Sequence, residues 1–172
     1  MNRKNQWQDR TFVLCVLIGC VAGLFFYYLY AHLRLSITPS AGARVFWIKK
    51  ECEFKRGEFA AVKPPPDDPF VPHPESVVLI KRFACMPGER IVVKGLEYYC
   101  LRRDGFKELV AVAKTKSRKG KKLTPWHPEG GDSLVIPDGF YFMANPDKDS
   151  YDSRYLGLIS KDRIVYCVEP VL

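Results

Sequence analysis

A serine and a lysine in the first half of the chain could do chemistry together. Ser40 ends the segment Ser36–Ser40, and Lys81 follows the apolar, β-branched run 77–80. A serine hydroxyl is a poor nucleophile until a neighbouring base takes its proton. A neutral lysine can be that base where burial lowers its pKa, because a low dielectric disfavours the ammonium. The pair indicates Ser–Lys nucleophilic catalysis. Most lone serines and lysines are surface residues, so the elements around them must support this reading.

The element before Ser40 is a long apolar segment. Residues 12–31 carry no charge, and at about 1.5 Å per helical residue they would span the roughly 30 Å hydrocarbon core of a bilayer. Tyrosines cluster at its end, as aromatic residues do at membrane interfaces. A cleaved signal peptide with a basic start is the rival interpretation. The run is longer than the apolar part of most signal peptides, and no small-x-small exit follows closely, which favours an uncleaved span.

The anchor divides the chain into three expected parts. These are a short basic cytoplasmic tail at 1–11, a transmembrane anchor at 12–31 and a catalytic domain at 32–172. Basic residues lie on both sides of the anchor and do not decide its orientation. Long domains can translocate despite their charge, so we expect the N-terminus inside and the domain on the outer side.

The pattern after the anchor is typical of a mainly β domain. Short runs of β-branched and aromatic residues are separated by turn signals, and no long stretch has helical periodicity. The strands are expected at 44–48, 59–62, 76–80, 90–93, 96–101, 133–136, 139–144 and 164–168. Two loop insertions interrupt them. One, near 63–75, is proline-rich and cannot form a central strand. The other, near 113–131, is first basic and then rich in proline and glycine.

The net charge of +8 is partly concentrated in the basic run 114–122. A solvated loop is the favoured interpretation, and its deletion should then leave catalysis intact. Contact with anionic lipid headgroups is the functional alternative. Nucleic-acid binding is not expected, because no recognition motif or aromatic platform accompanies the run.

Four of the six cysteines lie in the expected domain, at Cys52, Cys85, Cys100 and Cys167. If the domain faces an oxidising compartment, one or two disulfides are expected. Four cysteines allow three full pairings, and the sequence does not choose among them. No CxxC spacing occurs and the histidines are scattered, so we expect neither a zinc site nor another cofactor.

Three blocks, taken in order, resemble the type I signal peptidases, which are membrane-bound Ser–Lys endopeptidases. Thr38-Pro39-Ser40 follows the anchor, as the family's nucleophile block does. Segment 81–90 begins with Lys-Arg and ends in a Pro-Gly-acid turn. Segment 149–157 carries Asp-Ser-Tyr-Asp-Ser-Arg-Tyr-Leu-Gly. The resemblance implies an antiparallel, signal-peptidase-like β domain that cleaves leader peptides from exported precursors beside a lipid bilayer.

The resemblance also implies a role for each matching residue. Ser40 would be the nucleophile, Lys81 the general base and Ser150 the residue that orients Lys81. The Thr38 hydroxyl and the Ser40 amide would form the oxyanion hole. Structural support would come from an ion pair of Asp152 with Arg154, joined by Arg82. The ordinary alternatives are an interface hydroxyl at Thr38 and a plain turn at Asp152.

The particular residues in the three blocks indicate a subfamily. Ala41-Gly42-Ala43 follows the serine where general signal peptidases usually have methionine, and Glu89 replaces the commoner aspartate. The short domain and the 149–157 block resemble the TraF-type conjugative-transfer peptidases. That resemblance implies a pilin precursor as substrate, conjugation or type IV secretion machinery as partner, and the bacterial inner membrane as location, with the domain in the periplasm. A general signal peptidase for secretory preproteins and a non-catalytic envelope scaffold are the alternatives.

Overall fold

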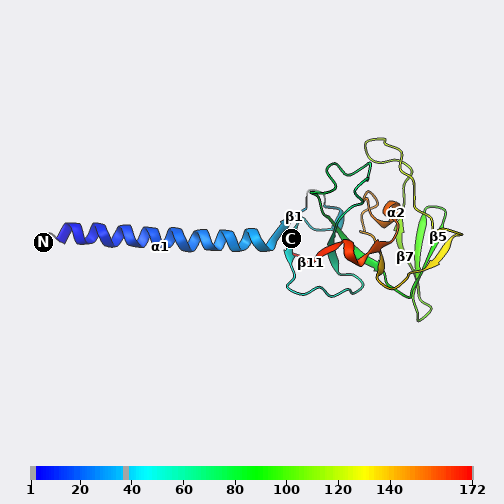
Figure 1. Ribbon diagram of the computed structural model, residues 1–172, viewed down its shortest axis with the longest axis horizontal. Coiled ribbons are helices and arrows are strands. Elements are labelled where there is room, and N and C mark those ends of the chain that lie inside the picture. Colours follow the sequence, from blue (N-terminus) through cyan, green and yellow to red (C-terminus); the bar gives the residue numbers. More distant parts are fainter. Residues whose placement is uncertain (1–2, 37–38, 172) are drawn as a thin grey trace. The chain divides into compact units, whose positions relative to one another are not determined.

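A single long helix, α1 (Arg3–His32), makes up most of the first of two structural units, Met1–Arg34 and Leu35–Leu172 (Figure 1). The structure is a computed structural model, and it describes residues 3–36 and 39–171. Within α1, Arg10–His32 is long and apolar enough to cross a membrane. Phe12, Leu17 and Phe25 are among its large apolar side chains that are exposed. A helix that is apolar on every side fits a lipid environment better than water.

The second unit contains two antiparallel sheets. Within this unit the larger sheet has the strand order β2-β11-β3-β4-β9-β10 and the smaller the order β7-β6-β5-β8. Figure 1 shows β5 and β7 of the smaller sheet on the side of this unit away from β11. The prediction of a mainly β, antiparallel domain is confirmed. The strands of the larger sheet in this unit are β2 (Val45–Ile48), β3 (Phe59–Val62), β4 (Leu79–Cys85), β9 (Phe140–Met143), β10 (Ile159–Ser160) and β11 (Ile164–Pro170); a further short strand, β1 (Leu33–Leu35), lies at the boundary between the two units. Those of the smaller sheet are β5 (Arg90–Lys94), β6 (Glu97–Leu101), β7 (Lys107–Val112) and β8 (Ser133–Val135).

Three short helical turns complete the unit: η1 (Pro39–Ala41), α2 (Ser153–Leu156) and η2 (Lys161–Arg163). The sequence predicted neither β7 nor α2. The prediction that a strand ends beside Lys81 was wrong, because β4 begins at Leu79 and continues to Cys85. Lys81 therefore lies inside a strand, opposite Ala60 of β3. A side chain at such a position meets the neighbouring strand's side chains on the same face of the sheet.

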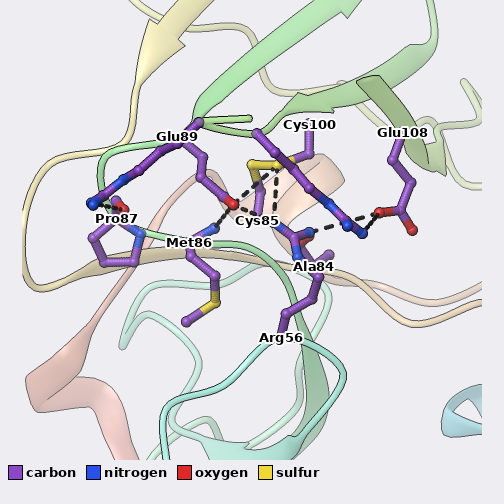
Figure 2. The surroundings of a disulfide bond; sticks show 10 residues. Arg56, Ala84, Cys85, Met86, Pro87, Glu89, Cys100 and Glu108 are labelled. Carbon is purple, nitrogen blue, oxygen red and sulfur yellow. Dashed lines mark hydrogen bonds and ion pairs between the residues drawn. A yellow bond between two sulfur atoms is a disulfide. The ribbon is translucent and has the colours of Figure 1, made fainter. Parts of the chain in front are cut away.

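Two disulfides hold the second unit together, Cys52–Cys167 and Cys85–Cys100. The second joins the end of β4 in the larger sheet to β6 in the smaller one. Figure 2 shows Arg56 beside it, with its guanidinium between Glu89 and Glu108. The Glu89 carboxylate also accepts a hydrogen bond from the Met86 amide at 2.7 Å. The acidic residue of the Pro-Gly-acid turn thus ties that turn to Arg56.

Two long loops connect strands of this unit, in the two regions where the sequence predicted insertions. The proline-rich one connects β3 to β4, and Asp68 within it accepts hydrogen bonds from the amides of Phe70 and Val71. The basic one connects β7 to β8, and its run 114–122 folds back on itself through a bridge between Lys116 and Lys122.

Candidate active site

Lys81 is a lysine buried in an apolar sheet. Its side chain lies on β4 beside Ala60 and shares a face with Phe83, both of which are fully buried. Only 6% of Lys81 is exposed. Burial lowers the pKa of Lys81 from 10.5 to about 8; the Asp152 carboxylate opposes this and the Arg154 guanidinium reinforces it. With a pKa of about 8, about a tenth of such a lysine is neutral at pH 7 and can accept a proton, whereas an ordinary lysine is almost wholly protonated there.

Ser150 is the hydrogen-bond partner of that lysine. Lys81 Nζ donates to Ser150 Oγ at 3.0 Å. Ser150 is 2% exposed, and its amide donates to the Asp147 carbonyl at 3.1 Å within a turn. The bond fixes the position of Nζ on the buried side of the sheet.

Ser40 lies on η1, which packs against β4. A hydrogen bond from the Ser36 amide to the Arg44 carbonyl at 2.8 Å closes the loop that carries it. Ala41 and Ala43 are buried in a cluster with Phe46 and Val168. Their small side chains let the loop approach the core closely, so the residues that follow the serine anchor the turn from which its hydroxyl projects.

Asn145 connects Ser40 to the strand of Lys81. Its Nδ2 lies 3.4 Å from Ser40 Oγ and donates to the Ile80 carbonyl at 2.9 Å. Its Oδ1 accepts from the Arg82 amide at 3.1 Å. One buried amide therefore contacts the serine hydroxyl and both chain neighbours of Lys81. Sequence reasoning missed Asn145; the signal was an Asn-Pro pair just after an expected strand and shortly before Ser150.

Asp152 and Arg154 form a fully buried, two-pronged ion pair. Arg154 Nε donates to Asp152 Oδ1 at 2.8 Å and Nη2 to Oδ2 at 2.7 Å. Asp152 is also the N-cap of α2 and accepts from the Asn145 amide at 3.1 Å. Arg154 reaches the carbonyls of Val112 and Asp147 as well. Breaking such a pair by removing one partner costs about 3–5 kcal/mol, because a buried charge is left alone.

The remaining expected site residues lie elsewhere. Arg82 forms none of the ion pairs found among the described residues, and its Nε is buried without a hydrogen-bond partner. Arg82 contributes to the site through its backbone amide, which donates to Asn145 Oδ1. Its side chain forms no ion pair with Asp152 among the described residues, so the expectation that Arg82 joins Asp152 and Arg154 was wrong. Thr38, the expected oxyanion-hole hydroxyl, lies outside the described residues.

One group of side chains within residues 3–36 and 39–171 has the composition of a metal site: Cys85, Glu89 and Cys100. The two sulfur atoms are bonded to each other as a disulfide, so neither is a thiolate. The guanidinium of Arg56 lies against the Glu89 carboxylate. This group is therefore part of the scaffold rather than a cation site.

Comparison with known proteins gives a family match over nearly the whole chain. A family model described as signal peptidase, peptidase S26, matches residues 4–171. Among solved structures, a signal peptidase I from Enterococcus faecalis V583 is 21% identical, covers 71% of this chain and 99% of its own, and has a TM-score of 0.42. No curated protein matches the chain.

Proposed function

This chain belongs to the signal peptidase family, peptidase S26, and from that premise we propose that Ser40 and Lys81 are its catalytic pair. The family makes the protein a serine peptidase whose substrates are precursor proteins carrying leader peptides. With its long apolar helix, it also makes the protein membrane-anchored. An anchor is physically sensible for this reaction, because the apolar part of a leader peptide lies in the same bilayer as the enzyme.

In the proposed mechanism neutral Lys81 takes the proton of Ser40 as Oγ attacks the scissile carbonyl carbon. The resulting Lys81 ammonium gives that proton to the leaving amine as the C–N bond breaks. Lys81 then takes a proton from the water that attacks the acyl-enzyme ester, and returns it to Ser40 Oγ as the ester C–O bond breaks, which restores the serine hydroxyl and the neutral lysine. The Ser40 amide and the Thr38 hydroxyl would donate to the oxyanion, where one good donor is worth roughly 3–4 kcal/mol.

The observation that carries the proposal is the burial of Lys81 together with its bond to Ser150. An exposed lysine would stay protonated at neutral pH, whereas burial lowers the pKa of Lys81 to about 8. The hydroxyl of Ser150 aims the nitrogen, and Asn145 connects Ser40 to the strand on both sides of the lysine. Ser150 and Asn145 therefore serve as positioning residues, and the pair of Asp152 with Arg154 supports the turn that carries Ser150.

The test is maturation of a leader-bearing precursor co-expressed with wild type, Ser40→Ala or Lys81→Ala. Wild type should yield the shortened product, and both variants should accumulate the precursor. Ser76→Ala and Lys94→Ala are matched controls, because both residues are exposed. Maturation by either active-site variant at the wild-type rate would exclude the Ser40–Lys81 mechanism.

We further propose that the catalytic domain faces the outer, periplasmic side of a bacterial inner membrane. The two disulfides support this, because such bonds persist in oxidising compartments and are rare in the cytosol. Protease added to intact spheroplasts should degrade the domain while a cytosolic marker stays whole. Protection of the domain until lysis would reverse the orientation.

The finer proposal concerns the substrate. The 149–157 block and the short domain resemble the TraF-type peptidases, which supports a pilin precursor of a conjugative type IV secretion system. A secretory preprotein is the competing substrate. Incubating the purified protein with each precursor and weighing the products by mass spectrometry separates the two. A pilin product lighter than the linear form by one water would mean that an amine, rather than water, resolves the acyl-enzyme.

A further inference from the structure

The two residues on either side of Ser150 are each held by one of the two loop insertions. Asp149 pairs with Lys114 and with Arg118, whose Nε lies 2.7 Å from Asp149 Oδ2. Tyr151 donates its hydroxyl hydrogen to Asp68 Oδ2 at 3.0 Å. The basic loop thus reaches one neighbour of the lysine-orienting serine, and the proline-rich loop reaches the other.

The backbone that carries Lys114, the partner of Asp149, is held in place. The Lys114 amide donates to the Tyr155 hydroxyl at 2.9 Å, and the preceding residue, Ala113, is buried in the core. Lys114 therefore projects from a held backbone, whereas Arg118 is 75% exposed and adds a second, weaker tie. The Lys114 ammonium and then the Arg118 guanidinium lower the pKa of Asp149, so the carboxylate is charged at working pH.

Tyr151 is held in place by packing against two other aromatic rings. The Tyr151 ring stacks on Tyr155, with centroids 5.4 Å apart and planes 9° from parallel. Phe70 of the proline-rich loop also packs against the Tyr151 ring, with the ring centroids 5.2 Å apart. Tyr155 therefore takes part in both attachments: its ring stacks on Tyr151, and its hydroxyl accepts the hydrogen bond from the Lys114 amide.

Two hydrogen bonds of the buried Ser150 are found among the described residues. Its amide bond to the Asp147 carbonyl closes the local turn, and its hydroxyl meets Lys81. A displacement of about 1 Å would stretch the 3.0 Å bond to Lys81 beyond hydrogen-bonding distance. Misplacement of that size can lower a catalytic rate by about 100-fold.

We propose that Asp149 and Tyr151 are positioning residues of the catalytic site, through which the two insertions clamp Ser150 and thereby aim Lys81. This inference rests on the proposed Ser40–Lys81 mechanism. It gives the basic run 114–122 a role inside the enzyme in place of a purely solvated loop. Lys114 and Arg118 act on the site, while the exposed Lys119 and Lys121 do not.

The experiment uses the purified full chain in detergent micelles with a leader-bearing precursor peptide. Asp149→Asn and Lys114→Met should each lower kcat by about 10- to 100-fold with KM changed less than about twofold, because Ser150 touches the base rather than the substrate. The double variant should be no slower than the slower single variant, since both changes remove one contact. Asp149→Glu should restore most of the rate, and Tyr151→Phe should lower kcat in the same manner.

Lys119→Ala and Lys121→Ala are the matched controls, since each removes one charge from the same loop. They should keep the wild-type kcat, and every variant should keep the wild-type Tm within about 3 °C. A wild-type kcat for Asp149→Asn, alongside an inactive Ser40→Ala, would overturn the clamp and leave the catalytic pair standing. An equal loss in Lys119→Ala would also overturn it, by showing a general charge effect. Full activity of Ser40→Ala would overturn both proposals.

Discussion

Asn145 Nδ2 lies 3.4 Å from the hydroxyl oxygen of Ser40, although 105 residues separate the two in the chain. The same nitrogen donates to the carbonyl of Ile80, which precedes Lys81. The contact with Ser40 is long for a hydrogen bond, so it restrains the hydroxyl without fixing its hydrogen. A single buried amide thus couples the expected nucleophile to the strand of the expected base.

We expect Asn145→Asp to lower kcat by about 10- to 100-fold. The carboxylate keeps the acceptor for the Arg82 amide but loses both donors, so Ser40 Oγ and the Ile80 carbonyl lose that partner. Steady-state kinetics on a precursor peptide give the measurement, with the melting temperature as a check on folding. A folded variant with wild-type kcat would show that Ser40 is positioned without Asn145.

The pH dependence of kcat/KM should follow the protonation of Lys81. The pKa of this lysine is lowered to about 8 by burial, and only its neutral form can accept the serine proton. Activity should therefore fall about tenfold per pH unit below pH 8 and level off above it. Initial rates between pH 5.5 and 9.5 would test this. A profile that stays flat down to pH 6 would contradict a lysine base.

Lys81→Met should be inactive and more stable than wild type at neutral pH. The pKa of Lys81 in the folded chain lies below its ordinary value of 10.5, so the unfolded state binds the proton more tightly. This destabilisation is fully present below about pH 8 and disappears as pH rises through 10.5. A pKa lowered from 10.5 to about 8 corresponds to roughly 3 kcal/mol, an upper bound on the gain.

Urea unfolding of wild type and Lys81→Met at pH 6 and at pH 9.5 measures this gain, which should be smaller at the higher pH. Lys94→Met, at an exposed position of β5, should show no such pH-dependent difference. A Lys81→Met protein less stable than wild type at pH 6 would mean that the hydrogen bond to Ser150 outweighs the cost of burying the charge.

Gly157→Ala should destabilise the fold more than Gly139→Ala does. Both glycines have positive φ, at 71° and 80°, where a side chain is strained by roughly 1–3 kcal/mol. Only at Gly157 would a Cβ also meet another group, the Trp126 indole nitrogen at 2.7 Å. Thermal unfolding of the two variants compares strain alone with strain plus a clash. Equal losses in melting temperature would show that Trp126 moves aside at no cost.

The sequence predicted much of the fold because strands leave a local record. Alternating apolar residues and turn signals located β2, β3, β5, β6, β9 and β11 to within a few residues, and the charge-free run 12–31 marked the centre of α1. β7 was missed because its lysine and glutamate hide the apolar alternation on a half-exposed strand. The predicted strand ended before Lys81 for a related reason. A charged residue after an apolar run usually marks the end of a buried strand, whereas here tertiary packing buries the lysine inside the strand.

By itself the sequence determined the kinds of residues that could react, their order along the chain, and the apolar anchor that precedes them. It did not determine the disulfide pairing, the place of Arg82, the amide of Asn145 between Ser40 and Lys81, or the attachment of Lys114 to Asp149. Those features depend on distances between segments far apart in the chain, which only packing of the two sheets sets. The pKa of Lys81 belongs with them, because a lysine becomes a base through the water that its neighbours exclude.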